Sequence, residues 1–142
     1  MRDGQRYPFV AGDSALGEAS LQPVLPIQLV YGQNRVNTGG LLDTGAMVNV
    51  LPYQQGLALR ANWEQQTTPL RLTGNLARYE ARVLLLMAIV GTFEPIQLAF
   101  AWTQAEDIPL ILRQVNFFME FNVCFYRSQL VFEVGPKDAS PS

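Results

Sequence analysis

One short stretch limits what this chain can fold into. Residues 41–46 read Leu-Leu-Asp-Thr-Gly-Ala, so two apolar residues lead directly into a carboxylate at the start of a Thr-Gly turn. A mainly apolar segment, residues 47–51, leads away from the turn. This pattern predicts two strands that meet at a sharp turn. Because an isolated ionised carboxylate is costly to bury, Asp43 is expected either to cap a tight Asx turn or to carry a function.

The composition narrows the chemistry that is open to Asp43. The 142 residues include no histidine and a single cysteine, Cys124. Without histidine, Ser-His-Asp and Cys-His catalysis are excluded, and with one cysteine ordinary zinc sites are excluded as well. Carboxylate-only chemistry remains. We therefore expect no metal and no cofactor.

Charge and hydropathy exclude two classes of partner. The net charge is -2, and the absence of a basic run argues against nucleic acid. The longest purely apolar run, residues 83–90, is too short to cross a bilayer, so we expect no membrane partner. The N-terminal residues do not resemble a secretory signal, and a lone cysteine fits a reducing compartment, which favours the cytoplasm. Between Val123 and Phe125, Cys124 is expected to be buried.

The chain is expected to form one all-β domain. Residues 1–22 lack periodicity and predict a flexible N-terminal arm, residues 23–135 form the domain, and residues 136–142, rich in Pro and Ser, predict a disordered tail. Residues 24–31 are β-branched and apolar, but Pro26 predicts an edge or bulged strand. Two long strands follow at 79–90 and 93–102, and one short helix lies within 114–121. Residues 60–68, around Trp63, are interpreted as a surface loop.

A second turn of interest lies in residues 70–78. Leucines alternate with polar residues on both sides of Thr73, Gly74 and Asn75, which predicts a hairpin with its tip at these three residues. Taken alone, this is an ordinary hairpin turn.

Peptide hydrolysis by carboxylates alone requires two of them around one water, sharing a proton. The chain contains only one Asp-Thr-Gly, so the second carboxylate is expected from another copy of the chain across a two-fold axis. Thr44 would then hydrogen-bond across the axis and Gly45 would leave room for backbone near the carboxylates. Ala46 is small enough for substrate to lie across it.

Residues 41–46 resemble the active-site turn of the retropepsins, the single-domain homodimeric aspartic proteases typified by the retroviral proteases. The resemblance covers about residues 24–134, and segments 51–63 and 108–125 look more like prokaryotic members, above all the cyanobacterial ones. It implies a closed β-barrel with a flap hairpin and one short C-terminal helix. Asp43 would be the catalytic residue, and Thr73, Gly74 and Asn75 would form the tip of a flap that closes over an extended peptide.

The same resemblance implies an aspartic endopeptidase with an acidic pH optimum and sensitivity to pepstatin. Hydrophobic side chains are the expected preference. One position departs from the family pattern, because Arg113 stands where a glycine usually follows Ile-Leu. Two alternatives therefore stay open: a catalytically weak or inactive dimer of this fold that binds peptides or scaffolds a partner, and a monomeric barrel with a chance Asp-Thr-Gly.

Overall fold

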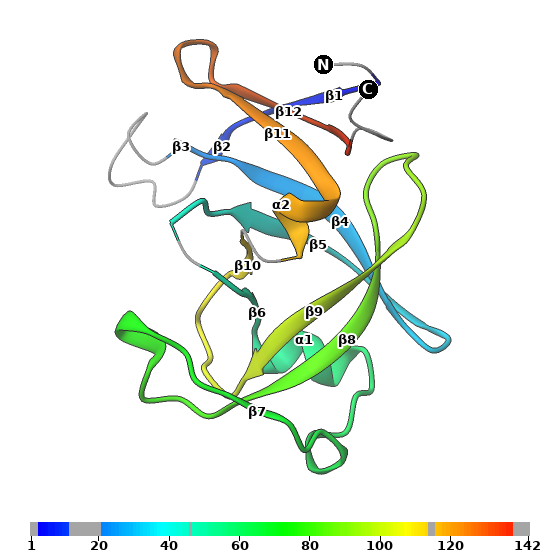
Figure 1. Ribbon diagram of the computed structural model, residues 1–142, viewed down its shortest axis with the longest axis vertical. Coiled ribbons are helices and arrows are strands. Elements are labelled where there is room, and N and C mark those ends of the chain that lie inside the picture. Colours follow the sequence, from blue (N-terminus) through cyan, green and yellow to red (C-terminus); the bar gives the residue numbers. More distant parts are fainter. Residues whose placement is uncertain (1–2, 12–20, 46, 114–115, 138–142) are drawn as a thin grey trace.

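The computed structural model describes residues 3–11, 21–45, 47–113 and 116–137, and it is built mainly of strands (Figure 1). The main sheet has the order β4-β5-β10-β6-β9-β8-β7. An additional pairing of β4 with β8 closes the first six of these strands into a barrel. The all-β barrel predicted from the sequence is thereby confirmed. The strands of the main sheet are β4 (Val24–Tyr31), β5 (Asn34–Leu42), β6 (Asn49–Leu51), β7 (Pro69–Leu70), β8 (Ala81–Ile89), β9 (Ile96–Thr103) and β10 (Leu110–Leu112).

Strand β4 shows why a proline is tolerated in a closed barrel. β4 pairs with β5 along its whole length, but with β8 only over Gln28–Val30. Pro26 faces Gly39 of β5 and lies outside the stretch that pairs with β8. Its missing N–H therefore costs the sheet no pairing with β8. The interpretation of β4 as an edge strand holds only for the half that contains Pro26.

A second sheet lies at the end of the molecule where both termini are found (Figure 1). It has the order β1-β12-β11, from β1 (Gln5–Pro8), β12 (Val131–Pro136) and β11 (Phe121–Tyr126). A short pair of strands, β2 (Val10–Ala11) and β3 (Leu21–Gln22), lies beside it.

The flexible arm expected for residues 1–22 is wrong for the described residues 5–11, because β1 pairs with β12. The Tyr7 ring stacks on Phe132 at 5.4 Å between centroids, and Phe9 contacts the same ring. Strand β1 has four residues and carries too few apolar positions to show a period. Pro136 ends β12, and residues 138–142 of the expected tail lie outside the described residues.

The helices are short. The C-terminal helix predicted within 114–121 is confirmed as α2 (Phe117–Glu120), while residues 114–115 lie outside the described residues. The others are α1 (Tyr53–Ala58) and the 3-10 turns η2 (Trp63–Gln65), η3 (Gly74–Leu76) and η4 (Arg127–Gln129). In the part of the chain that the structure describes, no helix is long and apolar enough to cross a membrane.

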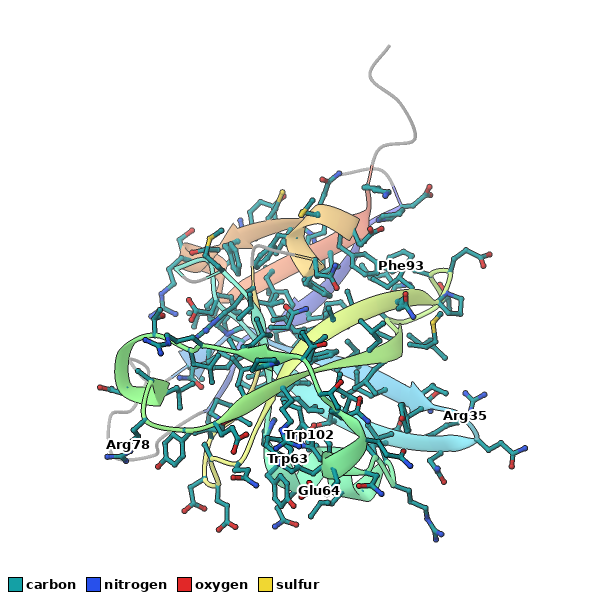
Figure 2. The ribbon with its side chains drawn as sticks, turned by 60° about the horizontal axis from the view of Figure 1, so that its bottom comes forward. Arg35, Trp63, Glu64, Arg78, Phe93 and Trp102 are labelled. Carbon is teal, nitrogen blue, oxygen red and sulfur yellow. The ribbon has the colours of Figure 1, made fainter. Side chains whose placement is uncertain are left out.

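The core fills the barrel and continues toward the terminal sheet through Phe117, Phe121 and Phe132. The ring of Tyr53, the first residue of α1, packs with the rings of Trp63 and Trp102. The centroids of the two indole rings are 5.1 Å apart (Figure 2). Trp63 is buried, so the surface loop expected around it is wrong for this residue. The residues next to Trp63 in the sequence are mostly polar and exposed, so the local sequence does not indicate that Trp63 is buried.

Candidate active site

Three strands determine where Asp43 lies. β10 lies between β5, which leads into the turn, and β6, which leads away from it. The backbone N–H of Asp43 donates to the carbonyl of Leu112 at 3.0 Å, which extends the pairing of β5 and β10 by one residue. A side chain at Gly40 would put its Cβ 2.5 Å from Leu112 Cδ1, so glycine permits this close approach. The backbone of Asp43 is therefore held by the barrel itself.

The turn also orients the carboxylate. The N–H of Gly45 donates to Asp43 Oδ1 at 2.9 Å. This is the hydrogen bond of an Asx turn, so it agrees both with a capping role and with a catalytic role for Asp43. The Asp43 side chain is 36% exposed, which leaves it reachable from solvent. Thr44 and Gly45 are exposed beside it.

Arg113 is an ion-pair partner of Asp43. Its Nε lies 3.5 Å from Asp43 Oδ2, and only 14% of its side chain is exposed. This Nε is buried and makes no hydrogen bond in the described part of the chain. A guanidinium stays protonated in proteins, so a permanent positive charge lies beside the carboxylate. The sequence marked Arg113 as unusual but did not show that it faces Asp43.

Asn49 holds the backbone behind this pair. Its side chain is fully buried; Oδ1 accepts from the N–H of Arg113 at 2.8 Å, and Nδ2 donates to the carbonyl of Ala99 at 3.1 Å. One amide thus connects β6, β9 and the end of β10. Asn49 was not among the site residues predicted from the sequence, although a lone amide inside the mainly apolar run 47–51 was the available signal.

The segment expected to be the flap hairpin has a different local structure. β7 contains only Pro69–Leu70, and residues 71–80 form a loop between β7 and β8. Thr73 precedes η3 at the N-cap position without a capping hydrogen bond from its side chain, and Gly74 has φ +65°, a conformation that favours glycine. The regular hairpin predicted over residues 70–78 is therefore wrong. Leu72 and Leu76 instead pack onto a small cluster that includes Val50 and Ile111.

Two cavities flank the turn. One of about 220 Å³ lies between the turn and the β7–β8 loop, and it is lined by Gly45, Met47, Val48, Arg71, Leu72, Thr73 and Arg113. The other, about 400 Å³, is lined by Leu41, Leu42, Asp43 and Thr44 together with Phe9, Gln22, Pro23, Phe125 and Arg127. Thr73 therefore lines the same cavity as Gly45, whereas Gly74 and Asn75 line neither cavity. Ala46 lies outside the described residues.

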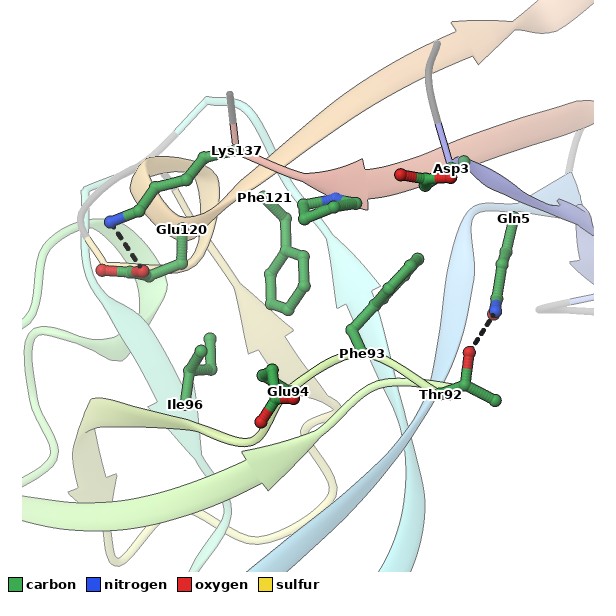
Figure 3. A pocket seen from close by; sticks show the side chains of 11 residues that line it. Asp3, Gln5, Thr92, Phe93, Glu94, Ile96, Glu120, Phe121 and Lys137 are labelled. Carbon is green, nitrogen blue, oxygen red and sulfur yellow. Dashed lines mark hydrogen bonds and ion pairs between the residues drawn. The ribbon is translucent and has the colours of Figure 1, made fainter. Parts of the chain in front are cut away.

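A larger cavity, about 650 Å³, lies elsewhere, between the β8–β9 turn and the terminal sheet (Figure 3). Phe93, Ile96 and Phe121 line it, with the ion pair of Glu120 and Lys137 at its edge (Figure 3). None of the site residues predicted from the sequence lies there. Size alone therefore does not identify the site. The carboxylate held between β5 and β6 remains the better candidate.

Comparisons with known proteins agree with this architecture. A scan of protein-family models and a search of curated protein sequences find no match. Among solved structures, a retropepsin-like aspartic protease from Rickettsia conorii matches with a TM-score of 0.60 at 12% identity, covering 92% of this chain and 91% of that chain. EIAV protease complexed with the inhibitor HBY-793 matches with a TM-score of 0.49 at 18% identity, covering 68% and 85%. The chain has a retropepsin-like fold, as the sequence predicted.

Proposed function

We propose that this chain is one subunit of a homodimeric aspartic endopeptidase that cleaves extended peptides. One observation carries the proposal: Asp43 lies at a tight turn between β5 and β6, backed by β10, with its carboxylate oriented by Gly45 and open to solvent. The fold supports it, because the Rickettsia conorii protein of similar structure is an aspartic protease. A lone cysteine supports a cytoplasmic location.

The proposed mechanism uses two copies of Asp43, one from each subunit. They share one proton because two carboxylates this close do not both ionise readily. One accepts a proton from water as the water attacks the peptide carbonyl, and the other donates a proton to the carbonyl oxygen. A proton then passes to the leaving amine. Activity is expected to peak below neutral pH, since one carboxylate of the pair must stay protonated, and no metal or cofactor is required.

The remaining residues have supporting roles in this proposal. Thr44 would connect the two turns, and Gly45 keeps the turn tight. Substrate would lie across Ala46, with its backbone hydrogen-bonded as an added strand. The loop that contains Thr73, Gly74 and Asn75 would close over it as the flap and exclude water.

A second candidate is a dimer of this fold that binds peptides without turnover. The contact between Arg113 and Asp43 favours it, because the guanidinium occupies one oxygen of the carboxylate that the mechanism needs. The two candidates differ in products. Peptide binding without cleavage at any acidic pH supports the second, and cleavage that pepstatin suppresses supports the first.

The decisive variant is Asp43→Asn, which keeps the size of the side chain and removes its acid–base chemistry. We expect peptide cleavage, measured by mass spectrometry on a mixed peptide library at several acidic pH values, to fall by roughly 10⁴-fold. Asp107→Asn is the matched control, because this exposed loop residue has φ 58°, which asparagine tolerates. Cleavage by Asp43→Asn at the rate of the unchanged protein contradicts the proposal.

A further inference from the structure

We propose that the cavity between the Asp43 turn and the β7–β8 loop is a subsite for an acidic side chain of the peptide, and that Arg71 and Arg113 bind its carboxylate. This inference rests on the proposed function and names the substrate class. It departs from the hydrophobic preference expected from the sequence.

The position of the cavity places its occupant next to the reaction. Gly45, which hydrogen-bonds to Asp43, and Thr73 of the β7–β8 loop both line the cavity. A side chain that enters here belongs to a residue close to the scissile bond. The volume, about 220 Å³, is below the range of roughly 300–1,000 Å³ for pockets that take a whole small ligand. It suits a single side chain.

The charges in the cavity point to a carboxylate. Of the 10 Lys and Arg residues of the chain, Arg71 and Arg113 line this cavity. No Asp or Glu is among the described residues that line it, although Arg113 is paired with Asp43 beside it. The Arg71 side chain is exposed and has no ion pair or hydrogen bond with the described part of the chain. Each guanidinium is a planar fork of donors that matches a carboxylate. These two arginines therefore form an anion-binding wall.

The apolar residues of the cavity favour a carboxylate on an aliphatic stem. Met47, Val48 and Leu72 complete the lining, and Leu72 is buried. Apolar neighbours lower the local dielectric, so a charge-assisted hydrogen bond here is stronger than on an open surface. Glutamate presents methylene groups to these residues and its carboxylate to the arginines. Glutamine has the same shape without the charge.

Arg113 also explains how an acidic side chain can lie so near Asp43. Two carboxylates at close range repel each other. Arg113 Nε lies 3.5 Å from Asp43 Oδ2, and Arg113 also lines the cavity, so its positive charge lies near both groups and offsets their repulsion. A glycine at this position would offer no such charge. The departure from the family pattern thus becomes part of the specificity.

The test uses matched peptides that carry Glu, Gln or Lys at each position around the scissile bond. We expect kcat/KM for Glu to exceed that for Gln by about fivefold, with Lys the poorest. Arg71→Ala should remove this preference, and Arg71→Lys should keep part of it. Arg78→Ala is the control, because Arg78 belongs to the same loop but stacks on Tyr79 and does not line the cavity. It should leave the preference unchanged.

Binding of reduced-amide versions of the same peptides separates this inference from the proposed function. If the Glu peptide binds more tightly than the Gln peptide, and Arg71→Ala abolishes this difference, the subsite is supported. If normal peptides are not cleaved in the same experiments, the protease is rejected while the subsite stands. Cleavage with equal rates for Glu and Gln, or no binding preference between them, overturns the subsite. Arg71→Ala should unfold at the same temperature as the unchanged protein. A lost preference for Glu can then be attributed to the cavity and not to loss of folding.

Discussion

The Asn49 side chain connects the backbone of Arg113, at the end of β10, with the backbone of Ala99 in β9. Replacing it with alanine removes its hydrogen bonds to the N–H of Arg113 and to the carbonyl of Ala99, which lie in a partly buried place. We expect Asn49→Ala to lower the free energy of unfolding by about 1–3 kcal/mol, measured in urea. Asn122→Ala, at an exposed position on β11, is the matched control and should change it by less than about 0.5 kcal/mol. Equal effects of the two variants would contradict this role.

The raised pKa values of two tyrosines predict that the protein loses stability at alkaline pH. Burial raises the pKa of Tyr7 above its ordinary value, and the negative charge of Glu133 together with burial raises the pKa of Tyr126. The unfolded chain then loses these phenolic protons before the folded chain does, so stability is full below about pH 10 and is lost as pH rises through the folded pKa values. Urea unfolding at about pH 9 and 11 should show this decrease.

The source of the Tyr126 shift can be tested separately. Tyr126 donates a hydrogen bond to Glu133 at 3.3 Å. In Glu133→Gln, the pKa of Tyr126, followed by ultraviolet absorbance, should move down toward about 10, while that of Tyr7 stays raised. Unchanged titration of Tyr126 in this variant would rule out Glu133 as the main cause.

Cys124 shows the limit of residue-level prediction. The apolar neighbours Val123 and Phe125 predicted a buried thiol, but Cys124 is exposed on β11. Among the strands that the structure describes, β11 pairs with β12 alone and is an edge of the terminal sheet. Which face of an edge strand is covered depends on the sheet that it joins, and the local sequence does not contain that information.

Helix α1 contains a glycine, Gly56, whose replacement by alanine should destabilise the protein, although helix propensity alone would favour alanine. Glycine in a helix is normally improved by alanine. A Cβ at Gly56, however, would collide with Cε2 of the Trp102 indole. We expect Gly56→Ala to destabilise the protein by about 1–3 kcal/mol in urea unfolding, because the packed tryptophan cannot move freely. Gln54→Ala, on the exposed side of α1, should be nearly neutral. A more stable Gly56→Ala would contradict this packing.

The β7–β8 loop shows why some elements escape sequence reasoning. Alternating leucines predicted strands on both sides of Gly74, yet Leu72 is buried from a loop and Leu76 belongs to η3. A leucine can pack onto the same small apolar cluster whether its backbone is in a strand or in a loop. Alternation over so few residues therefore does not distinguish a strand from a loop anchored at both ends.

The proposed dimer predicts how much activity is lost when unchanged and Asp43→Asn subunits are mixed. If each active site needs Asp43 from two subunits, a dimer of one unchanged and one Asp43→Asn subunit is inactive. After equilibration of equal amounts of the two proteins, random pairing should lower the activity per unchanged subunit to about half. Dilution of the unchanged protein should also lower its specific activity, measured by peptide cleavage alongside sedimentation. Activity that is independent of added Asp43→Asn protein would show that one chain suffices.

The all-β class, the C-terminal helix and the carboxylate turn between two strands could be predicted from the sequence. These follow from local patterns: alternation, apolar runs and the residues that a tight turn requires. The pairing of residues 5–8 with β12, and the closure of the barrel by β4 and β8, became visible only in the folded chain. The same holds for the contact of Arg113 with Asp43, seventy positions apart in the sequence. Such contacts depend on which distant strands become neighbours, and that is a property of the whole packed chain.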